Sequence, residues 1–537
     1  MYQVNINDQP HTLYDSEAVV FSFEETTVIT LMWTEQRNYT ITFDSDGGTP
    51  IDAISIPSYG TYSLKGIRPE REGYQFYGWY YATRQVYSGY YTFETDLTLK
   101  AAWNKLTPSD DFYYTTINDE AHINKYVGTN PIITVPDTID GYQVVQISDQ
   151  FLADFKTDEM VEIHLPKHLR TVKEYALSHQ DLKIVRFTVH PENPHLAVKD
   201  DVLYNKALTE IISYPSHKPG ESYTFIESIT SIYGRAFSNN AYLTHLTIPN
   251  TVTTIKRNAF QQTLALKTID LPNKLETINA NVFYRTSLES ITIPASVTSI
   301  KEEAFYAANN LRTIIFESGT TLEIGLRAFA FGVFEEFKFP NSVINISPLA
   351  FYGSNVKQFI IEEDNPNYQA IDGIIYTKDL KTIVAYPEMK AGESFTMPSS
   401  VDHIGAYAFY NVLNLKEITI PSTILSMGKG AFQETNQLKT IHFEENARLE
   451  TLPEDFIRGN NVLTEFIIPP SVTSIETNAF RNASINAIFI PKTVLNIATD
   501  AFYQWSEKTI YVESETDLSG YEENWHGGAS VTYGATP

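Results

Sequence analysis

The chain has 537 residues, a net charge of −26 and no cysteine. A surface this acidic repels phosphate backbones and anionic lipids, which argues against nucleic-acid and peripheral membrane binding. The lack of cysteine excludes disulfides, thiolate metal sites and cysteine nucleophiles. No apolar run reaches about 18 residues, so we expect no transmembrane helix.

Neither end of the chain carries a targeting signal. Residues 1–5 lack a basic region followed by an apolar one, and residues 534–537 form no hydrophobic tail or sorting motif. We therefore expect either an intracellular protein or a piece excised from a longer one.

Residues 1–36 echo the module that follows them. Residues 23–33 and 93–103 both run from a Phe through an acidic residue and a β-branched stretch to a Trp. We interpret residues 1–36 as a partial or degenerate copy of that module.

Residues 37–105 read as a small β-rich module, in which residues 39–43 alternate as a strand and glycines mark turns. A calcium loop at Asp44 and Asp46 is a weaker interpretation than a hairpin turn, because the full loop pattern with its distant Glu is absent. The module resembles the Listeria–Bacteroides repeat of internalin-type surface proteins through the segments TITFDSDGG, EGYQFYGWYY and LKAAW. The resemblance implies a β-grasp-like spacer on a bacterial cell surface.

Residues 106–145 have strand patterns but lack the unit that repeats after them. We predict that they form the N-terminal cap of a solenoid, which needs an atypical end to cover its open face.

From residue 146 to residue 512 one unit recurs, and its most regular part is the dipeptide Ala-Phe. Neighbouring copies of the Phe lie 22 to 24 residues apart, except for one step of 58 residues. A fixed period of this length predicts a β-rich (α/β) solenoid. The predicted core ladder consists of Phe237, Phe260, Phe283, Phe305, Phe329, Phe351, Phe409, Phe432, Phe456, Phe480 and Phe502.

Within one unit, Ile291 and Ile293 share one face of a strand, Pro294 ends the strand, and Phe305 fills the interior. This pattern resembles the BspA-type leucine-rich repeat over about 380 residues. The resemblance implies a leucine-rich repeat domain that serves adhesion. Two longer units, at residues 193–215 and 365–387, match each other, and we expect each to add a hairpin-like bulge. Residues 513–537 are predicted to form the C-terminal cap.

We find no nucleophile elbow, P-loop, dinucleotide fingerprint or zinc helix, so we expect no catalytic, cofactor-binding or metal-binding residues. His164 and His168 have a metal-pair spacing, but Pro166 forbids the helix that such a pair needs. Acidic pairs such as Glu302-Glu303 could form a hydrolase site, because equivalent positions of a solenoid lie in rows. We favour solvated turn residues instead.

The outward positions of the repeated strand are mostly polar, as in His245 and Thr247. Three successive units near the C-terminal end offer Ile467, Phe489 and Tyr511 instead, and neighbouring strands would align them in a stripe about 10 Å long on a concave wall. We predict that these three residues contact a ligand. The alternative is that they pack under the C-terminal hairpin.

These observations predict a non-catalytic protein of the bacterial cell surface or extracellular space that binds a host or microbial protein or glycan. Two alternatives stay open. One is a stalk that displays another domain, and the other is a carbohydrate-active hydrolase with a carboxylate pair on the concave face.

Overall fold

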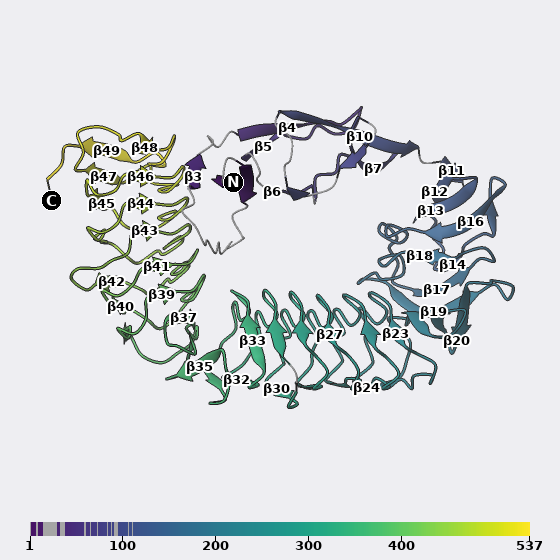
Figure 1. Ribbon diagram of the computed structural model, residues 1–537. Coiled ribbons are helices and arrows are strands. Elements are labelled where there is room, and N and C mark those ends of the chain that lie inside the picture. Colours follow the sequence, from purple (N-terminus) through teal and green to yellow (C-terminus); the bar gives the residue numbers. More distant parts are fainter. Residues whose placement is uncertain are drawn as a thin grey trace. The chain divides into compact units, whose positions relative to one another are not determined.

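The computed structural model describes residues 2–6, 9–13, 29–32, 38–57, 61–64, 66–71, 74–82, 84–86, 89–90, 95–105, 107–109, 111–319 and 321–536. The chain divides into two compact units. Unit 1 comprises residues 1–128 and 139–142, and unit 2 comprises residues 129–138 and 143–537. Figure 1 shows the strands of both units.

Unit 1 begins with a small antiparallel sheet, in which β1 pairs with β2 and β3. The residues between β2 and β3 lie outside the described residues, as do several of those that suggested a degenerate module copy. A five-stranded sheet follows in the order β5-β4-β10-β7-β8, with β4 and β10 parallel. The bounds are β1 (Tyr2–Ile6), β2 (Gln9–Leu13), β3 (Ile29–Met32), β4 (Asn38–Asp44), β5 (Ile54–Pro57), β6 (Thr61–Tyr62), β7 (Tyr74–Tyr81), β8 (Arg84–Val86), β9 (Gly89–Tyr90) and β10 (Leu97–Lys105).

The five-stranded sheet has its own core around Trp79. This ring is 2% exposed, lies 4.7 Å from the Phe43 ring, and donates a hydrogen bond to the Ile67 carbonyl at 2.8 Å. After β4, the Asp44 carboxylate accepts a hydrogen bond from the Asp46 backbone N–H at 3.0 Å, and Asp46 pairs with Lys100. These two aspartates therefore form a turn.

The rest of unit 1 is an antiparallel arrangement of β11 (Thr107–Ser109), β12 (Phe112–Ile117) and β13 (Glu120–Tyr126). Two further strands, β15 (Thr138–Ile139) and β16 (Tyr142–Ile147), contain residues of both units. The predicted cap at residues 106–145 is thus divided between the units, and the predicted domain boundaries stay predictions.

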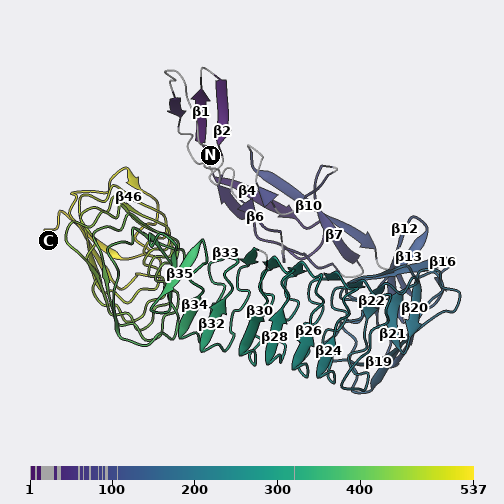
Figure 2. The same ribbon diagram turned by 60° about the horizontal axis from the view of Figure 1, so that its bottom comes forward.

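Unit 2 is a solenoid in which most turns contribute one longer strand to one face, which we call the long-strand face. Figure 2 shows β24, β26, β28, β30, β32 and β34 side by side on it. Neighbouring strands pair in parallel, for example Ile291 with Ile314. The bounds are β14 (Ile132–Thr134), β17 (Met160–Leu165), β19 (Lys183–Val189), β24 (His245–Thr247), β26 (Thr268–Asp270), β28 (Ser290–Ile293), β30 (Thr313–Phe316), β32 (Glu336–Phe339), β34 (Gln358–Ile361), β38 (Ser394–Thr396), β40 (Glu417–Ile420), β42 (Thr440–Phe443), β45 (Ala487–Ile490), β47 (Thr509–Val512) and β49 (Ser530–Tyr533).

A second face carries the shorter strands, and we call it the short-strand face. Over residues 230–350 it lies on the inner side of the bend, whereas the long-strand face lies on the outer side (Figure 1). The long strands are therefore not on a concave wall there. The bounds are β18 (Thr171–Val172), β22 (Glu210–Ser213), β23 (Ser231–Ile232), β25 (Thr254–Ile255), β27 (Thr277–Ile278), β29 (Ser299–Ile300), β31 (Leu322–Ile324), β33 (Val343–Ile346), β37 (Thr382–Ala385), β39 (His403–Ile404), β41 (Ser426–Met427), β43 (Thr451–Leu452), β44 (Ser474–Ile475), β46 (Asn496–Ile497) and β48 (Gly520–Tyr521).

Each Ala-Phe dipeptide lies in a turn that hydrogen-bonds to the next turn of the solenoid. The residue before the Ala has a positive φ, such as 55° at Glu303, and so does the residue two after the Phe, such as 53° at Ala307. In this backbone the N–H groups of Glu303, Phe305 and Ala307 donate to carbonyls of the following turn at 2.8 to 3.0 Å. The regular turns thus share a backbone ladder beneath their phenylalanines.

The phenylalanine side chains fill the interior, and all eleven of the core ladder are buried. From Tyr214 through Phe237 to Phe351, each ring stacks on the next with centroids 5.1 to 5.6 Å apart. Phe456 breaks the later part of the stack, because it meets Phe432 edge-on at an interplanar angle of 88°.

Two inserted turns interrupt the short repeat. In the first, β20 (Leu196–Lys199) and β21 (Val202–Asn205) form a hairpin that continues into β22, and in the second β35 (Tyr368–Ile371) and β36 (Ile374–Thr377) continue into β37. The expected hairpins are therefore present. Tyr386 stacks on Phe409 at 5.0 Å and takes the place of a ladder phenylalanine, which accounts for the 58-residue step.

The prediction of a β-rich solenoid is confirmed. The described residues form strands, turns and bends, and they contain no helix, so the α component of the expected fold is not seen in them.

Candidate functional site

Pairing along the long-strand face is interrupted between β26 and β28 and between β30 and β32, and at residues 464–468 a strand is missing as well. Side chains there alternate between exposed and buried, as in a strand, with Phe466 and Ile468 pointing inward. Among the described residues, however, no backbone hydrogen bond joins this segment to β42 on one side or to β45 on the other. One edge of β42 is therefore left without a partner strand.

A large core residue lies in this unpaired segment. Phe466 takes the position that Ile441 fills in the turn before and Ile488 in the turn after. Its ring reaches into the interior, where its centroid lies 5.6 Å from the rings of both Phe456 and Phe480. A phenylalanine at this position does not by itself prevent pairing, because Phe337 and Phe359 occupy it in β32 and β34 and pair directly with each other.

A second link to the following turn is missing at Pro470, where that turn also has Pro491 in place of the accepting glutamate. In three other turns, the residue after the strand-ending proline donates its backbone N–H to a glutamate carboxylate of the following turn. These pairs are Ala295 with Glu317, Ser422 with Glu444, and Lys492 with Glu513, at 2.9 to 3.1 Å. Proline has no N–H to donate.

A groove of about 930 Å³ follows the free edge of β42. Alternate residues of a parallel strand bond to opposite neighbours, and Thr440 and Glu444 donate their N–H groups to the β40 side. Ile441 and Phe443 therefore present their backbone N–H and C=O groups to the groove. The lining residues are Lys439, Thr440, Ile441, His442, Phe443, Glu444, Glu445, Asn446, Ala447, Thr464, Glu465, Phe466, Ile467, Pro469, Pro470 and Ser471.

The groove combines an apolar strip with excess negative charge. Phe443 is half-buried and its ring lies 6.2 Å from that of Phe466, while Ile467 is 85% exposed. Three glutamates line the groove against a single lysine, Lys439. The site thus offers unpaired backbone groups, exposed apolar surface and net acidity.

The structure separates the three predicted ligand-contact residues into two places. Ile467 lies in the groove, on a segment that is not paired with β45. Phe489 and Tyr511 lie directly opposite each other on β45 and β47, and Tyr511 is 41% exposed. The continuous three-residue stripe is therefore absent, and the ligand-contact role of these residues stays a prediction.

The expected C-terminal hairpin is not seen in the described residues: β48 and β49 instead pair in parallel with β46 and β47, and the tryptophan of this segment points into the interior. Trp525 is 2% exposed and packs against Phe502 and Tyr521, with ring centroids 5.9 and 5.3 Å apart. Sequence reasoning missed the groove itself. The Pro469-Pro470 pair, which lines the groove, is the signal in the sequence that marks it.

Other kinds of site are not seen in the described part of the chain. No three His, Asp or Glu side chains gather there as a metal-binding group, and no helix there is long and apolar enough to cross a membrane.

Residues 230–357 and 385–508 match the family described as BspA type Leucine rich repeat region, in six copies. Residues 39–102 match the Listeria-Bacteroides repeat domain. No curated protein matches the chain.

Several solved structures are similar to the chain. A leucine rich cell surface protein from Faecalibacterium prausnitzii is 21% identical, with 80% of this chain and 95% of that one covered and a TM-score of 0.43. The pneumococcal vaccine antigen PcpA is 20% identical over 80% and 98%, with a TM-score of 0.46. A leucine-rich repeat protein from Eubacterium ventriosum is 22% identical over 63% and 93%, with a TM-score of 0.45.

Both matched families are typical of bacterial surface proteins, and leucine-rich repeat proteins are generally non-catalytic. Repeat domains of this kind indicate a binding or scaffold role, generally toward proteins. The resemblances noted in the sequence are confirmed: residues 230–357 and 385–508 are BspA-type leucine-rich repeats, and residues 39–102 are a Listeria–Bacteroides repeat domain.

Proposed function

We propose that this protein is a non-catalytic adhesion protein of the bacterial cell surface, and that it binds an extended segment of a protein ligand in the groove along β42. The observation that carries the proposal is the unpaired edge of β42 beside the exposed Ile467. An extended peptide that adds to a sheet edge gains main-chain hydrogen bonds, and the pockets for its alternate side chains supply specificity.

The groove, and not the lack of pairing alone, supports recognition at this edge, because β26 and β28, and β30 and β32, are also neighbours that do not pair. Proteins usually protect sheet edges from pairing with other chains by charge, proline or cover. Here the edge lies within the face, between β42 and the 464–468 segment, where a ligand strand is flanked on both sides. Pro470 lines the groove beside Pro469.

The groove also predicts the kind of segment that fits. Phe443 and Ile467 favour apolar side chains at alternate ligand positions, because contiguous exposed apolar residues mark contact sites. Glu444, Glu445 and Glu465 favour a Lys or Arg at one end, since complementary charge speeds and orients association. We therefore expect a ligand segment that is apolar and basic.

A random dodecapeptide display library, selected on the full chain, tests this function. We expect enriched peptides to bind wild type and to lose at least tenfold in affinity to Ile467→Glu. The matched control is Leu495→Glu, which places the same charge on another exposed residue, 52% exposed, outside the groove. Equal binding to wild type and Ile467→Glu would remove the groove as the site.

N-methylation of a selected peptide tests the mode of binding. A peptide that pairs with β42 directs alternate N–H groups at the strand, so methylation at every second position should abolish binding while methylation between them is tolerated. If methylation is tolerated at every position of the peptide, the peptide does not bind by strand addition. The stalk alternative predicts that the library yields no binder at all.

The cellular location is tested separately. Antibodies raised against the full chain should label intact cells of the producing bacterium, and labelling only after lysis would contradict a surface location.

A further inference from the structure

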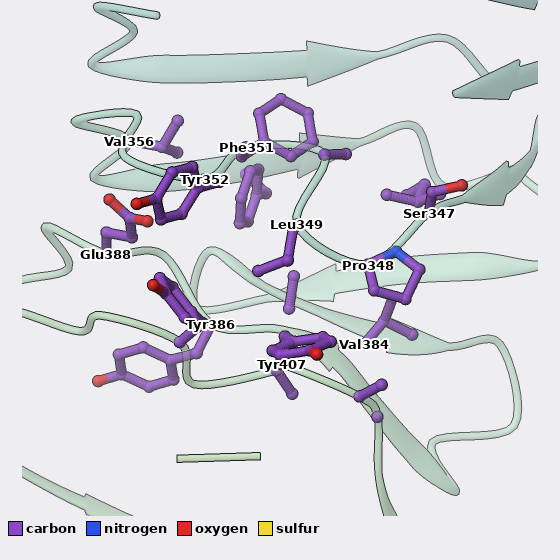
Figure 3. A pocket seen from close by; sticks show the side chains of 18 of the residues that line it. Ser347, Pro348, Leu349, Phe351, Tyr352, Val356, Val384, Tyr386, Glu388 and Tyr407 are labelled. Carbon is purple, nitrogen blue, oxygen red and sulfur yellow. The ribbon is translucent and has the colours of Figure 1, made fainter. Parts of the chain in front are cut away.

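A second open space lies inside the solenoid, at the junction beneath the second inserted turn. It is a cavity of about 250 Å³ between the turn that carries Phe351 and the turn that carries Tyr386 (Figure 3). The buried core divides into two clusters near this junction, one of which ends at Ile375 while the other begins at Ile374. The cavity is separate from the groove along β42.

The junction lacks the backbone ladder that joins the regular turns. In those turns three N–H groups donate to carbonyls of the next turn. At this junction Gly353 N–H donates instead to a side chain, the Glu388 carboxylate, at 2.8 Å. Among the described residues, no backbone carbonyl of the following turn accepts from Leu349 or Phe351. Another backbone bond still joins the two turns, from Met389 N–H to the Val356 carbonyl at 2.9 Å.

Aromatic rings form much of the cavity wall. Phe351 and Tyr386 are buried, while Tyr352, Tyr407 and Tyr410 are half-buried and reach the surface. The Tyr352 and Tyr410 rings meet edge-on with centroids 5.2 Å apart. Leu349, Val356 and Val384 add aliphatic surface. Figure 3 shows Tyr352, Tyr386 and Tyr407 around the space.

Glu388 is the one ionisable carboxyl group in this wall. The residue is 8% exposed, and Figure 3 shows its carboxylate beside Tyr352. Burial raises the pKa of Glu388 to about 8, although the hydrogen bonds from Gly353 and from the Asn411 side chain act in the opposite direction. Both bonds are donated to the carboxylate, which has further acceptor sites. No Lys or Arg lines the cavity to balance a charge there.

We propose that this cavity binds a small organic amine, with its ammonium group on Glu388 and its apolar body among the aromatic rings. Aromatic faces attract a cation, and an opposite charge at ion-pair distance favours the carboxylate over the buried neutral acid. A cavity of about 150 Å³ accommodates benzene, so this one accommodates a ring with a short aminoalkyl group. It is smaller than the roughly 300 to 1,000 Å³ of sites for drug-sized ligands.

Binding of a protonated amine requires the carboxylate form, so it releases a proton from Glu388 at neutral pH. The proton leaves to the buffer, no covalent bond forms, and affinity rises as the pH approaches 8. A structural role of Glu388 alone would not produce this linkage.

Calorimetry of the full chain with benzylamine tests the proposal, with benzyl alcohol as a neutral probe of the same shape. We expect saturable binding of benzylamine, at least tenfold tighter than that of benzyl alcohol. Repeating the titration in buffers of different ionisation enthalpy should show release of most of one proton at pH 7. Absence of saturable binding, or equal affinity for the alcohol, overturns the proposal.

Three variants locate the site. Glu388→Gln keeps a hydrogen-bond acceptor for Gly353 but no charge, so the preference for the amine and the proton release should both disappear. Val384→Phe places a ring in the cavity without touching Glu388, and it should abolish binding of both probes. Glu362→Gln, which removes one exposed charge outside the cavity, should change nothing. Persistence of amine binding in Val384→Phe places the site elsewhere and overturns the proposal.

Discussion

The first and second halves of the solenoid have the same repeat, but only in the second half is the stack of core rings interrupted. The first half also has an open space of about 650 Å³ beside Tyr306, but its ring stack is continuous. From Tyr214 to Phe351 six successive ring pairs stack without a break. Beyond Phe351 the interior is interrupted twice, at the junction that holds the cavity and at Phe456 near the groove. The repeat therefore builds the frame, and departures from it create space for ligands.

The two inserted turns show how small the decisive changes are. The space beneath the first insert is about 10 Å³, against about 250 Å³ beneath the second. At the first, Arg235 lies over the Tyr175 ring at 3.7 Å and Tyr233 lines the remaining space. At the second, the positions of Tyr233 and Gly234 are taken by Gly405 and Ala406. Loss of one large side chain leaves the second junction open.

The largest difference in stability between the two halves is expected when the tyrosine at each junction is truncated. Tyr214→Ala is expected to cost about 3 to 5 kcal/mol of unfolding free energy, because its ring has protein on all sides. Tyr386→Ala should cost about 1 kcal/mol less, since its ring already borders a cavity and makes fewer contacts there. Urea unfolding of both variants measures the difference, and equal costs would contradict the contrast between a sealed and an open junction.

The pH dependence of stability should differ between wild type and Glu388→Gln. The pKa of Glu388 is raised from 4.5 to about 8 in the folded chain, so the folded state holds a proton that the unfolded state releases. This contribution to stability is complete below about pH 4.5 and is lost as the pH rises toward 8.

The loss in wild type is expected to be about 3 kcal/mol between pH 5 and pH 8, and Glu388→Gln should lack it. Urea midpoints at pH 5, 6, 7 and 8 measure the two slopes. Parallel slopes would show that Glu388 is already ionised in the folded chain. Ser216 occupies the equivalent position of the first junction, so no pH-dependent contribution to stability is expected there.

One buried asparagine at each insert should contribute equally to the free energy of unfolding. Asn193 and Asn365 are each fully buried, and each amide donates to two carbonyls of the preceding turn and accepts from two backbone N–H groups at 2.7 to 3.1 Å. Alanine at either site leaves these groups unsatisfied, at an expected cost of about 2 kcal/mol. Unfolding of the two variants should agree within about 0.5 kcal/mol. A larger gap would mean that the junctions differ in more than the space beneath them.

The sequence predicted the frame well, because the frame depends on residues that repeat. The period of the Ala-Phe dipeptide predicted the solenoid, and the match between residues 193–215 and 365–387 predicted two hairpins. The open spaces were not predicted, since each appears only in the packing of neighbouring turns. The segment around Phe466 reads as one more strand, and Gly405 as one more turn residue, until the neighbouring turns are in place.

Ligand contact was predicted from the outward positions of the three residues alone. The strand pairing in the structure then showed that the three residues do not form one surface. Ile467, Phe489 and Tyr511 occupy equivalent positions, so the sequence predicted one stripe. The unpaired segment at residues 464–468 separates Ile467 from the other two. Nothing in the residue types at these three positions distinguishes the groove from the neighbouring strands.

The smallest change in stability is expected for the double variant Phe489→Ser with Tyr511→Ser. Tyr511 is exposed and Phe489 is half-buried, and the cap is anchored elsewhere, through Trp525 on Phe502 and Tyr521. The double change should therefore alter the free energy of unfolding by about 0.5 kcal/mol or less, as for other surface substitutions. Hydrogen exchange of the β47 and β49 amides should stay as in wild type, while faster exchange there would show that the pair holds the C-terminal end together.

Peptide binding by the same variant then shows whether β45 and β47 belong to the binding surface. A groove that ends at the unpaired segment predicts that peptides selected on wild type keep their affinity for the double variant and lose it for Ile467→Glu. A loss in both variants would mean that the bound segment crosses from β42 over the unpaired residues to β45 and β47. The second interruption of the solenoid would then be the centre of a longer binding surface.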